Sequence, residues 1–170
     1  MKRWRQIAFC ALLVTVGSAV MFPNSYIYFG VLHGIAVMLL IARLTASWGS
    51  WLWLVGGVAI AAKYVANYAL TAGFWNLSLN ERWLNWLGLI SVKPITEDYV
   101  PLVPWLAVMW WGMAATQWWL KRNLTTTQPL PTLPRLLRPL AALGRWSLSY
   151  YMLHQPILLA GIGIWAFLAR

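Results

Sequence analysis

The sequence predicts an all-α polytopic membrane protein: a helix bundle of about five transmembrane helices plus one helix that lies in the membrane interface. Of the 170 residues, 61% are hydrophobic and 9% are charged, and the mean hydropathy is +0.63. A soluble domain carries about a quarter charged residues, so this chain has too few to cover a water-facing surface. The apolar residues also form runs of about 20, the length that crosses a bilayer. A transmembrane barrel would show alternating segments of about ten residues instead.

Five apolar runs define the expected spans, and we treat residues 1–170 as a single integral membrane domain. The spans are expected at about residues 6–22, 27–44, 51–70, 102–120 and 146–168. The first run follows a basic start and contains small residues, so it also fits a cleaved signal peptide. We favour a membrane span there, because a second apolar run follows almost at once.

The region between the third and fourth spans is the longest polar connection, and we expect an interfacial helix in it. Within Leu79–Ile90, four apolar residues share one helical face: Trp83, Trp86, Leu87 and Ile90. This spacing is typical of a helix that lies in the plane of the interface. Residues 121–139 are rich in proline, which predicts a mostly extended linker before the fifth span.

The basic residues indicate topology rather than a nucleic-acid partner. The net charge is +10, but no basic stretch alternates with aromatic residues outside an apolar span. We therefore expect the lipid bilayer, and no nucleic acid, as the partner. With a cytoplasmic N-terminus, nine of the 13 lysines and arginines are cytoplasmic, three lie outside and Lys63 lies within the third span. This agrees with the positive-inside rule and puts the C-terminus on the outer side.

The second span contains one ionisable residue, His33, flanked by Gly30 and Gly34. Two glycines at this spacing allow a neighbouring helix to come close. An ionisable group inside a membrane is a functional candidate, and a neutral imidazole can act as a general base for an acyl acceptor. The alternative is that His33 hydrogen-bonds a neighbouring helix and only fixes packing.

The fifth span carries the second histidine, His154, just before Pro156. Proline can kink a helix and free backbone carbonyls for polar neighbours or a ligand. Ser147, Tyr150 and Tyr151 add hydroxyl groups on neighbouring faces. Such a polar stripe suits a pocket wall, and it suits interhelical hydrogen bonding equally well.

Lys63 lies in the third span with Asn67 one turn further on. Its ammonium group can snorkel to the outer interface or pair with Glu97 or Asp98, and we favour the pair. The two adjacent carboxylates lie at the outer mouth of the fourth span. They can activate an acceptor amine or hydroxyl, or they can cap a helix N-terminus.

Arg145 opens the fifth span on the cytoplasmic side. It can hold a phosphate group of a cytoplasmic cofactor, or it can serve only as a topology anchor. No metal site is expected, because the two histidines are far apart and Cys10 is the only cysteine.

Three stretches together resemble a known family. They are FPNSYIYFGVLHGIAVMLLIARL (Phe22–Leu44), EDYVPLVPWLAVMWWGM (Glu97–Met113) and LGRWSLSYYMLHQPILL (Leu143–Leu159). In order and spacing they resemble the bacterial membrane proteins that are similar to the catalytic domain of heparan-α-glucosaminide N-acetyltransferase. With the connecting spans, the resemblance covers nearly the whole chain.

The resemblance implies a multi-pass acyltransferase of the bacterial inner membrane. It implies acetyl-CoA as co-substrate from the cytoplasmic side, and a glycan-type acceptor with an amine or hydroxyl on the periplasmic side. His33 or His154 would act as base or relay, and Asp98 would orient the acceptor. Arg145 would face the CoA phosphates, and the expected pocket residues are Tyr150, Gln155, Lys63 and Asn67.

The chain departs from the family pattern at its start. Family members normally begin with two further helices, the first carrying an Asp-x-x-Arg-Gly-type stretch and a histidine. We therefore expect a truncated chain that is inactive alone, or one that works with a partner that supplies these helices or as a homo-oligomer. The rival hypothesis is a non-catalytic integral membrane subunit or structural membrane protein. A transporter is disfavoured because the sequence shows no internal repeat.

Overall fold

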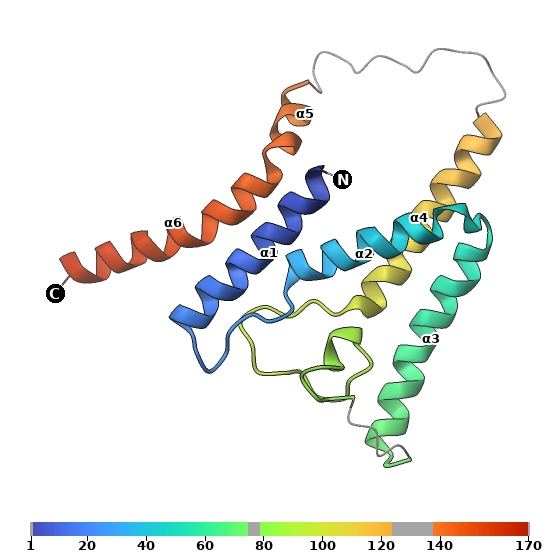
Figure 1. Ribbon diagram of the computed structural model, residues 1–170, viewed down its shortest axis with the longest axis horizontal. Coiled ribbons are helices and arrows are strands. Elements are labelled where there is room, and N and C mark those ends of the chain that lie inside the picture. Colours follow the sequence, from blue (N-terminus) through green and yellow to red (C-terminus); the bar gives the residue numbers. More distant parts are fainter. Residues whose placement is uncertain (1, 75–78, 124–137, 170) are drawn as a thin grey trace. The chain divides into compact units, whose positions relative to one another are not determined.

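The computed structural model describes residues 2–74, 79–123 and 138–169, which form helices joined by turns and loops and contain no strand (Figure 1). The expected all-α class is therefore confirmed. The chain divides into two compact units, residues 1–126 and 127–170, and each is described by itself.

The first unit is a bundle in which α2 packs against both α1 and α4, and α3 packs along α4 (Figure 1). Its elements are α1 (Lys2–Met21), α2 (Val31–Thr45), the 3₁₀ turn η1 (Ala46–Trp48), α3 (Trp51–Thr71), the 3₁₀ turn η2 (Asn85–Leu87) and α4 (Leu102–Asn123). The second unit holds α5 (Arg138–Arg145) and α6 (Ser147–Leu168), and α6 continues through Pro156.

Four helical segments among the described residues are long and apolar enough to cross a membrane: α1, α2 with η1, α3 and α6. They correspond to four of the five expected spans. The remaining expected span, at residues 102–120, corresponds to α4. This helix has 22 residues, but it is rich in tryptophan and ends in Lys121 and Arg122, which lowers its hydropathy. That α4 spans the membrane stays a prediction.

The core of the first unit lies where α2, α3 and α4 meet. Its buried residues are Met38, Leu52, Leu102, Leu106, Trp110 and Ala114. A Cβ atom at Gly56 would come within 2.5 Å of the Trp111 indole nitrogen, so this glycine allows α3 and α4 to touch. The two mid-helix tryptophans also join helices, because Trp110 donates to the Thr45 hydroxyl at 2.9 Å and Trp111 donates to a backbone carbonyl of α3 at 3.1 Å.

The expected interfacial helix over Leu79–Ile90 forms turns and the short η2 instead of a continuous helix. The backbone carbonyl of Asn85, which a continuing helix would use, accepts a hydrogen bond from the Tyr99 hydroxyl at 2.5 Å. Gly88 then takes a left-handed conformation with φ of 89° and ends the turn. Tertiary hydrogen bonds therefore override the amphipathic spacing of this segment.

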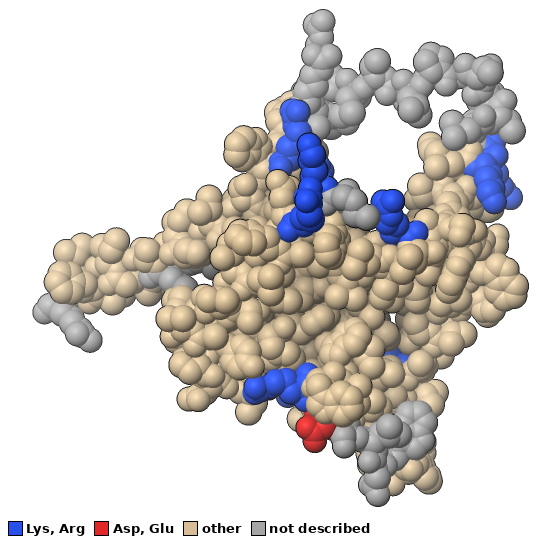
Figure 2. Space-filling view, viewed as in Figure 1, with Lys and Arg blue, Asp and Glu red and all other residues tan. Residues whose placement is uncertain are grey.

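The acidic side chains of the first unit all lie in the loops between α3 and α4, and most of its basic side chains lie at helix ends. Basic residues lie at the start of α1, in the last turn of α2 and in the last turn of α4. Figure 2 shows lysine and arginine side chains at the end of α4, and the acidic side chains at the other end of the unit with basic side chains beside them. The basic ends of α1, α2 and α4 fit the alternation that the topology prediction assumes for the first unit, and the side of the membrane on which each end lies stays a prediction.

Candidate active site at the start of α2

The carboxylate of Asp98 lies at the N-terminus of α2, where its Oδ2 atom accepts a hydrogen bond from the backbone amide of Val31 at 2.8 Å. The first amides of a helix have no intrahelical partner, and the helix dipole favours an anion there. Of the two roles considered for this carboxylate, capping is the one observed. The capped helix is α2, which is 67 residues away in the chain, rather than the adjacent α4.

Gly30 and Gly34 make room for residues 98–100, the loop that leads into α4, rather than for a neighbouring helix. A Cβ atom at Gly30 would overlap the Asp98 carboxylate, and one at Gly34 would lie 3.2 Å from the backbone oxygen of Val100. The amide of Val100 donates to the carbonyl of Phe29 at 3.4 Å. The expectation of close helix contact at these glycines was therefore wrong: residues 98–100 occupy that space.

His33 is half-buried in the first turn of α2 and contacts α1. Its Nδ1 atom accepts a long hydrogen bond from the amide of Gly30 at 3.4 Å, which is half of a capping box. The neutral ring then carries its proton on Nε2, which donates to the Thr15 hydroxyl at 3.1 Å. His33 and Asp98 therefore contact adjacent backbone amides, and His33 also joins two helices.

Two loops hold this site together by pairing with each other. The amide of Glu97 donates to the carbonyl of Ser25 at 3.0 Å, and the Ser25 hydroxyl donates to the Glu97 carboxylate at 2.5 Å. The Thr96 hydroxyl donates to the carbonyl of Tyr26 at 3.0 Å. Residues 25–29 and 96–100 thus run together and carry Asp98 to the start of α2.

Next to these loops lies a cluster of aromatic and polar side chains that sequence reasoning missed. The Arg82 guanidinium lies over the rings of Tyr26 and Tyr28, at 5.2 and 5.5 Å from their centroids, and donates to the Tyr26 hydroxyl at 3.2 Å. Asn85 is 2% exposed and donates to the Tyr28 hydroxyl at 2.7 Å. Burial raises the pKa of Tyr99, the other partner of Asn85, so its phenol stays neutral and donates. The two tyrosines in FPNSYIYF were the available sequence signal.

The pairing of Lys63 with Glu97 or Asp98 does not form, since no ion pair joins these three described side chains. The carboxylates are instead bound by Ser25 and by the amide of Val31. Asn67 donates to the carbonyl of Ile90 at 3.3 Å and so ties α3 to the loop before α4. A role for Lys63 or Asn67 in a substrate pocket stays a prediction.

The remaining predicted site residues belong to the second unit. In α6, His154 stacks on the ring of Tyr150 with centroids 5.7 Å apart, and its Nδ1 donates to the Tyr150 carbonyl at 3.2 Å. Arg145 is exposed at the end of α5. The side chain of Gln155 lies outside the described residues. The structure thus brings together only His33 and Asp98, and the roles of the residues in the second unit stay predictions.

No group of three or more metal-ligating side chains occurs in the part of the chain that the structure describes. A family model described as heparan-alpha-glucosaminide N-acetyltransferase, catalytic, matches residues 1–156. No curated protein and no solved structure matches the chain.

Proposed function

This chain belongs to the heparan-α-glucosaminide N-acetyltransferase catalytic family, and we propose that it moves an acetyl group from acetyl-CoA to the amine or hydroxyl of a glycan-type acceptor. A membrane acetyltransferase-like protein is what the family and the apolar helices support directly. The observation that carries the proposal is the meeting of His33 and Asp98 at the first turn of α2.

In this proposal His33 is the general base. Its Nδ1 lone pair accepts only a long hydrogen bond at 3.4 Å, so an acceptor hydroxyl or amine can replace that contact. The acceptor oxygen or nitrogen attacks the thioester carbonyl while Nδ1 takes its proton. The carbon–sulfur bond then breaks, and the CoA thiolate leaves and recovers the proton from the imidazolium.

Asp98 orients the acceptor in this proposal. The amide of Val31 fixes one carboxylate oxygen, which sets the direction of the group without neutralising its charge. A carboxylate held in this way accepts a hydrogen bond from a sugar hydroxyl or amine and stabilises the positive imidazolium of His33. Both effects are larger where water is excluded.

The acetyl-CoA side of the proposal rests on the second unit. Arg145 is exposed and is proposed to face the CoA phosphates from the cytoplasm, where its planar guanidinium can bind a phosphate with two hydrogen bonds. His154 is the alternative base or relay, and Tyr150, Gln155, Lys63 and Asn67 are proposed to line the pocket. We place the protein in the bacterial inner membrane with a periplasmic acceptor, together with any partner chain or second copy that completes the enzyme.

The test is acetyl transfer from labelled acetyl-CoA to glucosamine by protein purified from its native membranes. We expect His33→Ala to lower kcat by about 100-fold or more, because a general base contributes that much. Asp98→Asn keeps the hydrogen bond from Val31 but loses the charge, so we expect a higher KM and a lower kcat. Unchanged turnover in folded His33→Ala and His154→Ala would refute catalysis by either histidine.

A second candidate function is a non-catalytic membrane subunit, and the hydrogen bond between His33 and Thr15 favours it. In that case His33 only joins α1 to α2. Thr15→Val would then lower the melting temperature as much as His33→Ala does, and the purified protein would not bind acetyl-CoA. If Thr15→Val and His33→Ala melt alike while His33→Ala loses far more acetyl transfer than Thr15→Val does, the enzyme hypothesis holds.

A further inference from the structure

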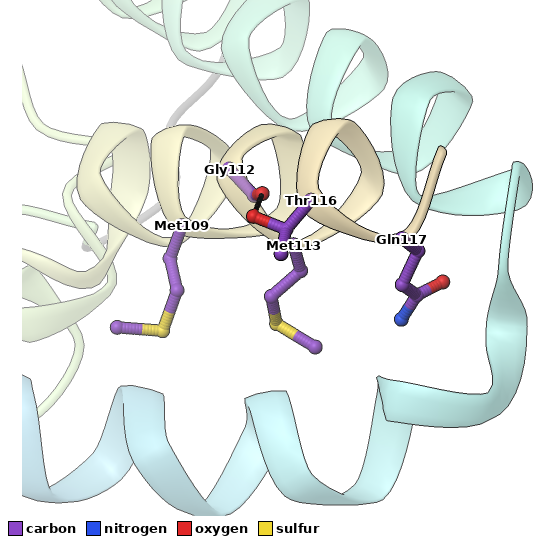
Figure 3. A pocket seen from close by; sticks show the side chains of 5 residues that line it. All are labelled: Met109, Gly112, Met113, Thr116 and Gln117. Carbon is purple, nitrogen blue, oxygen red and sulfur yellow. Dashed lines mark hydrogen bonds between the residues drawn. The ribbon is translucent and has the colours of Figure 1, made fainter. Parts of the chain in front are cut away.

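An open groove of about 510 Å³ runs along α4 on the side that faces α2. Its lining residues are Met109, Gly112, Met113, Thr116 and Gln117 (Figure 3). The lining carries no charge, and the Thr116 hydroxyl is already bound to the carbonyl of Gly112 at 2.8 Å. In Figure 3 the two methionine side chains project from α4 toward α2. The groove therefore offers an adaptable apolar surface.

The last turns of α2 and α4 carry cations near one end of this groove. Gln117 donates to the backbone carbonyl of Ala46 at 2.9 Å, so the end of the groove lies beside the end of α2. Arg43 stands three residues before Ala46, and Lys121 stands one turn after Gln117 on α4. Both cations thus lie near the point where the groove reaches the end of the bundle.

The acidic residues are too far away to neutralise these cations. Asp98 is bound at Val31, twelve residues before Arg43 on the same helix, which is a separation of about 18 Å along the axis. Glu97 is bound to Ser25, in the same pair of loops. Glu81 precedes Arg82, whose side chain binds Tyr26 of these loops. No carboxylate of the described residues pairs with Arg43 or Lys121, so an anionic group of another molecule can bind there.

We propose that this groove binds one anionic phospholipid, with an acyl chain along Met109 and Met113 and the phosphate at Arg43 and Lys121. The groove extends about 12 Å from Met109 to Gln117. Met109 and Met113 lie one helical turn apart along this length, so one hydrocarbon chain that follows the groove can contact both side chains. The phosphate is placed at these two cations because basic residues near a membrane surface attract anionic lipid headgroups. This proposal does not depend on acetyl transfer.

Native mass spectrometry of the purified full chain tests the proposal, with phosphatidylglycerol and phosphatidylcholine of identical acyl chains as probes. We expect phosphatidylglycerol to bind about 25-fold more tightly, because each of the two cations favours an anionic headgroup by about fivefold. Lys121→Gln removes one cation and should lower this preference to about fivefold, while binding of phosphatidylcholine stays unchanged.

Two matched glycine variants test the acyl-chain part of the site. A Cβ atom meets nothing within 4 Å at Gly112 in the groove or at Gly57 on α3. Gly112→Leu therefore begins its side chain in open space in the groove and should weaken phosphatidylglycerol binding roughly tenfold, since it displaces at least two methylene groups. Gly57→Leu adds the same side chain elsewhere and should leave binding unchanged.

Three results would overturn the proposal. Equal affinity for the two lipids would mean that only the apolar surface binds. Equal phosphatidylglycerol binding by Gly112→Leu and Gly57→Leu would mean that the groove does not hold the chain. Displacement of the lipid by inorganic phosphate alone would indicate an anion site without an acyl chain. If Gly112→Leu does not fold, the lipid preference of Lys121→Gln decides the question by itself.

Discussion

Replacing Gly30 by alanine is the sharpest test of the site at the start of α2. Gly30 has φ of −98°, which alanine adopts readily, so the substitution introduces no backbone strain. Its methyl group would overlap the Asp98 carboxylate and would lie 2.8 Å from a methyl carbon of Ile27. Asp98 must then move, and the hydrogen bond from Val31 at 2.8 Å is lost.

The expected cost follows from that hydrogen bond. A hydrogen bond to a charged group contributes about 1.5–3 kcal/mol. The interaction of the carboxylate with the helix dipole adds about 0.3–1 kcal/mol. Gly30→Ala should therefore destabilise the first unit by about 2–4 kcal/mol, which is a drop of roughly 4–16 °C in Tm for a chain of this size.

Two further glycines give a graded control series. Gly34→Ala places its methyl 3.2 Å from the Val100 oxygen, a contact that a small shift relieves, so we expect a cost below about 1 kcal/mol. Gly57→Ala meets nothing and should be neutral or stabilising by up to about 1 kcal/mol. Tryptophan fluorescence during heating in detergent gives the Tm of all three variants. The reasoning is refuted if Gly30→Ala melts within 2 °C of Gly34→Ala.

Three other predictions concern packing and pH. Trp110→Phe removes the bond to Thr45 and should cost about 1–3 kcal/mol, whereas Trp105→Phe on the exposed side of α4 should cost little; thermal melts of both variants decide this. Gly56→Leu should separate α3 from α4 and lower the Tm by more than 5 °C, and a Tm equal to that of Gly57→Leu would contradict the observed contact. Burial raises the pKa of Tyr99, so its contribution to stability is complete below about pH 10 and is lost as the pH rises above that value. Tyr99→Phe should therefore flatten the fall of Tm above pH 10, and an unchanged slope would exclude Tyr99 as its cause.

The helices were predictable because the information for them is local. Expected spans at 51–70 and 146–168 compare with Trp51–Thr71 and Ser147–Leu168 in the structure. The start of α2 was placed four residues too early, at residue 27 rather than Val31. The reason is tertiary: Tyr26 and Phe29 use their carbonyls to bind Thr96 and Val100, so these residues cannot join the helix.

The residues of the candidate site could be predicted from the sequence, but the contacts that bring them together could not. His33 and Asp98 were both identified, because ionisable groups are rare in apolar sequences. Their meeting depends on a contact across 67 residues, which no local pattern encodes. The Lys63 pair failed for a related reason, because Glu97 and Asp98 find donors in residues 25–31 of the folded chain. The spacing of residues in the sequence shows which charged groups are present. It does not show which polar groups of the folded chain lie closer to them and bind them instead.

The two roles weighed for His33 depend on the same geometry and do not exclude each other. The Thr15 hydroxyl accepts from Nε2, so α1 selects the tautomer whose lone pair is on Nδ1. That lone pair lies at the turn where Asp98 places its negative charge, because the two groups contact the consecutive amides of Gly30 and Val31 at the start of α2. Without α1, a neutral imidazole would exchange its proton between the two nitrogens and would spend part of its time unable to accept there. The contact that packs α1 against α2 is therefore also the contact that would prepare His33 to act as a base.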